Sequence, residues 1–177
     1  NLPFGWFNAY AHANARGDID LVAHVGDYLY EYPIGDYPSL KQALPGREIQ
    51  PAHEMVALAD YRLRYAAYRS DPDLARLHAL FPMIAQWDDH EFANDAWKGG
   101  AENHNDGEGS WTDRVAAAER AHGEWMPVAD TRWTAAKKAL IRDSRVHGTR
   151  QLVRAVLQDG AAVAVLVHGS AIGYYGD

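Results

Sequence analysis

Two short apolar stretches each end abruptly in acidic, aromatic and imidazole groups, and this repeated pattern constrains the fold most strongly. The first stretch reads VAHVGDYLYEY at residues 22–32, and the second reads QWDDHEFAN at residues 86–94. Apolar runs this short, bounded by turn residues, are typical of buried strands. A third apolar run, Ala161–Val167, is followed by His168. Because sites in open sheets lie at the carboxyl ends of strands, we expect the polar groups that follow these runs to converge.

Periodic segments surround these runs and predict a layered domain of the α/β or α+β class. A helix is expected to begin at Pro51, with an apolar stripe that includes Tyr61, Tyr65 and Tyr68. Two polar segments, residues 32–50 and 98–109, are expected to be an irregular loop and a mobile loop. The other helices are predicted at residues 3–15, 72–81, 110–125 and 133–142, with a less regular pattern at 151–157.

Composition and charge exclude several classes of function. The chain has 177 residues, a formal net charge of −7 and no cysteine. A negative protein without a block of Lys or Arg has no general attraction for nucleic acid. No apolar run is long enough to span a bilayer, and thiolate metal sites and disulfides are impossible within the chain. The length is sufficient for one domain with its own core.

The acidic groups after the first two apolar runs argue for bound cations. Asp27, Asp88, Asp89 and Glu91 would bring several negative charges into one partly apolar rim, where repulsion and desolvation cost free energy. Few Lys or Arg residues lie near them in the sequence, so cations are the simplest way to neutralise them. Carboxylate and phenolate oxygens suit iron(III), manganese, magnesium or calcium. The Asp-Asp-His-Glu string could instead be a helix N-terminus whose carboxylates bind its own amides.

Two motifs carry a resemblance to a known superfamily. The string GDYLY at residues 26–30 resembles the GDxxY motif of purple-acid-phosphatase-type enzymes within the calcineurin-like metallophosphoesterases. The string WDDHE at residues 87–91 resembles the motif of the PhoD-like alkaline phosphatases. The similarity to the PhoD-like pattern covers most of residues 4–127. A later string, DSR at residues 143–145, followed by RQ, faintly resembles a later segment of the family.

The resemblance implies an αββα metallophosphoesterase-like sandwich and a site with two or more metal ions, iron(III) together with calcium or another divalent cation. By that analogy Asp27 bridges two cations, Tyr30 binds the iron(III)-like ion and Asp89 binds the second ion. His90 would contact the phosphoryl oxygen or protonate the leaving alkoxide. The residues expected to support the site are Asp88, Glu91 and Asn94.

The reaction that the resemblance implies is hydrolysis of small-molecule phosphate esters of the alkaline phosphatase D type, monoesters or diesters. A metal-bound hydroxide would attack the phosphorus in line. A periplasmic or secreted location is implied by the resemblance alone. Two alternatives remain open: a non-catalytic remnant of such a domain that binds a metal or a partner, and a metal-dependent hydrolase of non-phosphate esters.

The sequence departs from the family pattern at both ends. The family's first ligand segment would lie upstream of Asn1, and its late His-x-His motif is missing. We therefore expect residues 1–177 to form a single metallophosphoesterase-like domain that lacks its upstream and late ligand segments, so that the sandwich is incomplete. After Pro127 the family pattern fits poorly. His168 is either a surviving late ligand or a loop histidine, and His24 is expected to be a packed, hydrogen-bonded core residue.

Overall fold

The computed structural model describes residues 5–36, 41 and 43–126, and these contain four helices and two strands. The described residues belong to one of two compact units, the one formed by residues 1–129 and 169–177. The predictions for residues 133–142, 143–151, 151–157, 161–167 and His168 lie outside the described residues. The elements in chain order are α1 (Asn8–Asn14), β1 (Val22–His24), α2 (Leu58–Arg69), α3 (Pro72–Leu80), β2 (Met83–Ala85) and α4 (Trp111–Trp125).

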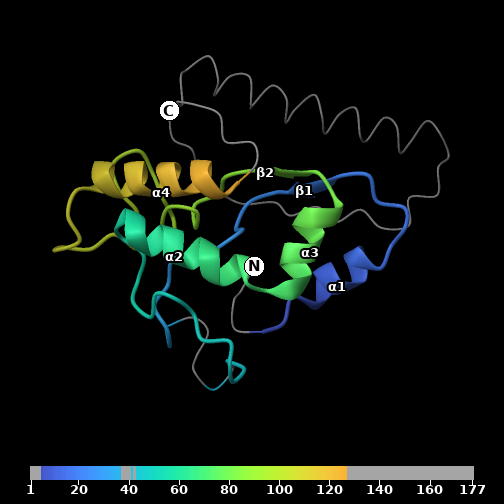
Figure 1. The fold of residues 1–177 in the computed structure, drawn as a ribbon. Coiled ribbons are helices and arrows are strands. Elements are labelled where there is room, and N and C mark those ends of the chain that lie inside the picture. The colour runs from blue at the N-terminus through green and yellow to red at the C-terminus, as the bar shows by residue number, and fades with distance from the viewer. Residues whose placement is uncertain (1–4, 37–40, 42, 127–177) are drawn as a thin grey trace, which may run out of the picture. The chain divides into compact units, whose positions relative to one another are not determined.

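The two strands pair in parallel and form the small sheet that positions the site (Figure 1). The register aligns Val22 with Met83 and His24 with Ala85. Because the strands are parallel, both of their carboxyl ends lie at the same edge. The crossover between them contains α2 and α3. The expected α/β class is thus confirmed, although the strands are buried on one face only, since Ile84 is 51% exposed.

Helix α2 begins seven residues later than the sequence predicts, at Leu58 rather than Pro51. The Asp60 carboxylate accepts hydrogen bonds from the amides of Val56 (3.1 Å) and Ala57 (2.8 Å), which satisfies the first turn of the helix. Met55 is fully buried but precedes the helix. The predicted apolar stripe is otherwise confirmed, because the three tyrosines of α2, Tyr61, Tyr65 and Tyr68, are buried.

The other helix boundaries follow their capping residues. Asp71 caps α3 by accepting hydrogen bonds from the next two available amides, and Pro72 occupies the first turn, as predicted. Leu74 and Leu77 of α3 are buried, whereas Leu80 at the end of the helix is 46% exposed. Ser110 caps α4 as predicted, and its side chain accepts from the amide of Asp113. Helix α1 is shorter than the predicted 3–15.

The helices pack in two pairs around the core, α1 against α3 and α2 against α4 (Figure 1). Tyrosines of α2 also reach the loops that follow the strands. Tyr68 Oη accepts a hydrogen bond from the amide of Tyr30 at 3.1 Å, and Tyr61 Oη donates to the carbonyl of Phe92 at 2.5 Å. Helix α2 therefore holds residues of both loops that follow the strands β1 and β2. Within the described residues, no helix has the length and apolar character needed to cross a membrane.

Candidate metal centre

The loops after β1 and β2 bring Asp27, Asp89 and His90 together. One potential ligand atom from each side chain lies within 4.8 Å of the other two, and all three residues are partly exposed. The expected convergence of the two strand ends is therefore present in the structure. Whether these three residues bind a metal stays a prediction.

Tyr30 borders this group, as the sequence suggested. Its hydroxyl donates a hydrogen bond to Asp27 Oδ2 at 3.0 Å, and its ring centroid lies 4.3 Å from that of His90. Asp27 has a φ of 51°, which is uncommon for a residue with a side chain. The preceding Gly26 has a φ of 109°, and a Cβ there would lie 2.5 Å from the Cβ of Asp88. Only glycine allows the two loops to approach this closely.

Glu91 ties the two loops together from inside. Its carboxylate, 1% exposed, accepts hydrogen bonds from the amides of Tyr28 (2.5 Å) and Asp88 (2.5 Å) and a longer one from Asp27 (3.3 Å). Burial raises the pKa of Glu91 to about 7; the hydrogen bonds from the amides of Asp88 and Tyr28 oppose this shift, and the charges of Asp27 and Asp88 add to it. The Glu91 carboxylate thus binds backbone amides of both loops, and its role as a supporting residue stays a prediction.

Asp88 and Asp89 face different surroundings. Asp88 is 7% exposed, and its Oδ1 accepts from the amide of Asp89 at 3.0 Å. Burial, followed by the charges of Asp27 and Asp89, raises the pKa of Asp88. Asp89 Oδ2 accepts from the amide of Asp95 at 2.6 Å. No helix begins at these residues, so the alternative interpretation as a helix N-terminus is wrong in that respect. Its other part is confirmed, because the carboxylates of Glu91 and Asp88 do accept from amides of the same segment.

Glu31 is a site residue that the sequence analysis did not single out. It is fully buried, and its carboxylate contacts His90 Nδ1 at 2.8 Å, the amide of Asn94 at 2.6 Å and Asn103 Nδ2 at 3.0 Å. Burial would raise the pKa of Glu31, but the contacts with His90, Asn103 and Asn94 outweigh it and lower the pKa. The only sequence signal was an acidic residue between two tyrosines in an otherwise apolar stretch.

His90 and Asn94 are held by these acidic residues. Burial alone would lower the pKa of His90, but the hydrogen bond and charge of Glu31, with the charges of Asp89 and Asp27, produce a net rise. Asn94 supports the site through its backbone amide, because its side chain donates to Glu102. The side chain of Asn94 is therefore not turned to the metal-ligand group.

Two buried arginines anchor the loops around the site. Arg64 donates to the carbonyls of Tyr30 and Tyr32 and to three carbonyls near the start of α2. Arg64 is fully buried. Its neighbour Arg62 does lie outside and pairs with Glu124 at 2.6 Å. Because Arg64 binds the backbone on both sides of Glu31, it fixes the path of the chain there.

Arg114 anchors the segment 98–109, which was expected to be mobile. Its buried guanidinium binds Glu54 (2.7 Å), Glu108 (3.1 Å) and the carbonyl of Asn103 (2.6 Å). The side chain of His104 is only 12% exposed and lies against the same guanidinium. This segment is thus attached to α4 and contributes Asn103 to the site.

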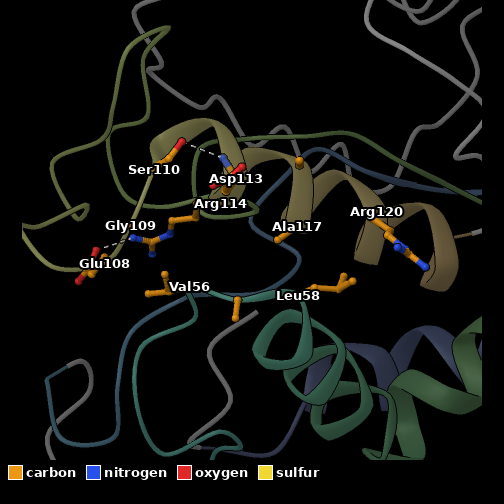
Figure 2. Close-up of a pocket in the computed structure, with 11 residues that line it drawn as sticks. Val56, Leu58, Glu108, Gly109, Ser110, Asp113, Arg114, Ala117 and Arg120 are labelled. Carbon is orange, nitrogen blue, oxygen red and sulfur yellow. Dashed lines mark hydrogen bonds and ion pairs between the residues drawn. The ribbon is translucent and has the colours of Figure 1, made fainter.

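A pocket of about 470 Å³ lies between the start of α2, the segment 108–110 and the first turns of α4 (Figure 2). Arg114 extends along its wall toward Glu108, while Arg120 lies further along the helix. None of the lining residues belongs to residues 26–31 or 88–94, which carry the acidic group. The pocket is therefore lined by other residues than the candidate metal centre.

His24 differs from its expectation. It is partly buried in β1, but its Nδ1 is buried and makes no hydrogen bond to any described residue. Burial lowers its pKa to about 4. Its ring packs edge-on against Tyr28, 5.3 Å between centroids. His24 is thus a neutral packing residue rather than a hydrogen-bonded one.

The donor set fits a hard metal ion. Two carboxylates and an imidazole can converge on one ion, and a phenol lies beside them. Within residues 5–36 and 43–126, neither Asp88 nor Asp89 forms an ion pair with Lys or Arg. A cation would therefore neutralise charge that these protein side chains do not.

Comparisons with known proteins agree with the motifs. Alkaline phosphatase D from Bacillus subtilis (strain 168) is 40% identical over 124 residues, which cover 70% of this chain and 20% of that protein. A solved structure described as "Structure of PhoD" is 35% identical with a TM-score of 0.62, over 73% of this chain and 26% of that chain. The chain thus spans only about a fifth to a quarter of these relatives.

A shorter match leads to a different kind of protein. Epimerase family protein Mb2239 from Mycobacterium bovis is 46% identical over 50 residues, 28% of this chain and 16% of that protein. The family model described as "PhoD-like phosphatase", in contrast, matches residues 1–153. This match covers most of the sequence and includes both loops of the candidate metal centre, so the chain belongs to the PhoD-like phosphatase family.

Proposed function

We propose that this protein takes part in metal-dependent hydrolysis of phosphate esters, of the alkaline phosphatase D type. The observation that carries the proposal is the convergence of Asp27, Asp89 and His90 within 4.8 Å at the ends of two parallel strands. Membership of the PhoD-like phosphatase family supports it. The substrate would be a small-molecule phosphate monoester or diester.

Each residue of the site would have a separate task. Asp27 and Asp89 would hold the metal ions, with Tyr30 beside Asp27 as a phenolate ligand. His90 has its Nδ1 engaged by Glu31 at 2.8 Å, so its Nε2 is the atom that can reach a metal ion, a phosphoryl oxygen or a leaving oxygen. Bound metal ions would supply the Lewis acidity that activates a water molecule and neutralises charge on the phosphoryl group.

The identity of the metals and the location are part of the same proposal. Oxygen ligands with one imidazole favour iron(III) with calcium or another divalent cation in a di- or multinuclear site. A periplasmic or secreted location follows from the family resemblance. We also propose that residues 1–177 belong to one metallophosphoesterase-like domain.

Asp27→Asn tests the proposal directly. The purified full chain is assayed with p-nitrophenyl phosphate and bis-p-nitrophenyl phosphate, and its metal content is measured by elemental analysis. We expect the variant to lose bound metal and at least about 100-fold in turnover, because an amide is a poor bridging ligand. Asp18→Asn is the matched control, since Asp18 is exposed and, among the residues that the structure describes, forms an ion pair only with Arg16. Full turnover in Asp27→Asn would remove this residue from the site.

A non-catalytic role is the second candidate, because Asp27, Asp89 and His90 could also hold a metal ion that only stabilises the fold. Stoichiometric metal that raises the unfolding temperature, without hydrolysis of either phosphate ester, would support it. Turnover of carboxylate esters in place of phosphate esters would point to a different hydrolase. A visible charge-transfer band lost in Tyr30→Phe would identify iron(III).

A further inference from the structure

The surroundings of Glu31 determine which nitrogen of His90 carries a proton. Glu31 is fully buried, and an ionised carboxylate can only accept hydrogen bonds. One oxygen, Oε1, accepts from the backbone amide of Asn94 and from Asn103 Nδ2. The other, Oε2, lies 2.8 Å from His90 Nδ1. This nitrogen must therefore donate its N–H to the carboxylate.

The same contact sets the direction of the opposite nitrogen. With Nδ1 turned to Glu31, the His90 atom left to join the group with Asp27 and Asp89 is Nε2. A neutral imidazole protonated at Nδ1 carries its lone pair on Nε2. The side chain of Tyr30, 4.3 Å away between ring centroids, packs on the imidazole face and restricts its rotation.

We propose that Glu31 is a positioning residue that holds the neutral form of His90 in the Nδ1–H tautomer, so that the lone pair of this form lies on Nε2, the nitrogen on the side of Asp27 and Asp89. Its use in catalysis rests on the proposed function, but the tautomer does not. The loop 98–109 shares in this task, because Asn103, whose carbonyl binds Arg114, occupies the other oxygen of Glu31.

Glu31→Gln tests the proposal because the amide has one acceptor and one donor end. The two asparagine donors keep the Gln oxygen, so the Gln NH₂ faces His90 and requires Nδ1 to accept. Two-bond ¹H–¹⁵N correlation spectra of the metal-free full chain, at about pH 9 where imidazole is neutral, report the tautomer. The His90 signal is identified by its loss in His90→Gln. We expect Nδ1–H in the unmodified protein and Nε2–H in Glu31→Gln.

Asn105→Ala is the matched control, because Asn105 lies in the same loop and binds Glu108 instead of Glu31. It should leave the His90 tautomer unchanged. An Nε2–H tautomer in the unmodified protein would overturn the proposal, even if Glu31→Gln does not fold. An unchanged Nδ1–H tautomer in a folded Glu31→Gln protein would overturn it as well.

Mn²⁺ titration separates this proposal from the proposed function. We expect Glu31→Gln to bind Mn²⁺ about 10- to 100-fold more weakly, as measured by electron paramagnetic resonance of free Mn²⁺. Equal affinity in the two proteins would contradict the positioning role. If the unmodified protein shows the Nδ1–H tautomer but binds no Mn²⁺, the metal centre fails while the structural role of Glu31 stands.

Discussion

At the scale of single residues, the acids of the site divide into two groups. Asp27 and Asp89 are partly exposed and point toward one another, whereas Glu31 and Glu91 are buried and bind hydrogen-bond donors of the protein. The sequence predicted which residue types gather at the strand ends. It did not distinguish ligands from supports, because Glu31 meets His90 across 59 residues and burial depends on such long-range contacts.

Glu91→Gln should destabilise the protein and loosen the site. Three amides share the Glu91 carboxylate, and a Gln side chain has only one oxygen to accept from them. At least one buried amide then lacks an acceptor, which costs about 1–3 kcal/mol in the free energy of unfolding. Urea denaturation followed by tryptophan fluorescence measures the loss. Glu102→Gln, on the exposed side of Asn94, should change stability by less than about 0.5 kcal/mol. An equal loss in both variants would contradict the supporting role of Glu91.

At the scale of elements, boundaries were predictable where a capping residue marks them. Asp71 and Ser110 are N-cap residues that mark the starts of α3 and α4 in the sequence, and both helices begin directly after them. The predicted start of α2 was wrong. Pro51 suits the first turn of a helix, but it suits equally well the extended segment in which its carbonyl accepts a hydrogen bond from Arg64. Nothing local to Pro51 reveals that Arg64, thirteen residues away, binds its carbonyl.

Asp71 has two roles in α3 that substitution can separate. It caps the helix, and its buried carboxylate pairs with Arg47 at 2.9 Å. Asp71→Asn keeps a capping oxygen but loses the charge pair, so we expect a loss of about 1–3 kcal/mol in unfolding free energy. Asp71→Ala should cost about 1 kcal/mol more, through loss of the cap. Thermal denaturation followed by circular dichroism measures the stabilities of the two variants relative to the unmodified protein.

Ser110→Ala provides the comparison for a cap without an ion pair. It should cost about 1 kcal/mol, close to the difference between the two Asp71 variants. If Asp71→Asn were as stable as the unmodified protein, the ion pair with Arg47 would contribute nothing to α3.

At the scale of the whole molecule, acid should weaken the packing between α4 and the β2 loop. His122 is 4% exposed and stacks on Trp87 at 4.0 Å, and burial lowers its pKa to about 4 from an ordinary value of 6.5. The unfolded chain therefore takes up this proton first. The contribution of His122 to stability is complete above pH 6.5 and is lost as the pH falls toward 4.

His122→Phe keeps the stacked ring and removes the titration. Between about pH 7.5 and 4.5, the unfolding free energy of the unmodified protein should fall relative to the variant by up to about 3 kcal/mol. Glu91, whose raised pKa acts in the opposite direction, is present in both proteins and cancels in this difference. Denaturant titrations at several pH values measure the difference in unfolding free energy between the two proteins. If this difference did not change with pH, His122 would not be buried as a neutral ring.

The family, and the mixed α/β class of the described residues, could be predicted because two short motifs fall at the ends of two strands. The complete set of site residues could not be predicted from these two motifs. A sandwich distributes its ligands over many strands, and the described residues supply the ends of only two.

The internal fastening by Glu91 has a consequence for loading the site with metal. The buried Glu91 carboxylate accepts hydrogen bonds from amides in the loops after both strands, so the protein's own contacts hold these loops together beside Asp27 and Asp89. A cation that binds at Asp27 and Asp89 would therefore not have to order these two loops first. Binding and release of the cation would then leave the backbone of the two loops unchanged.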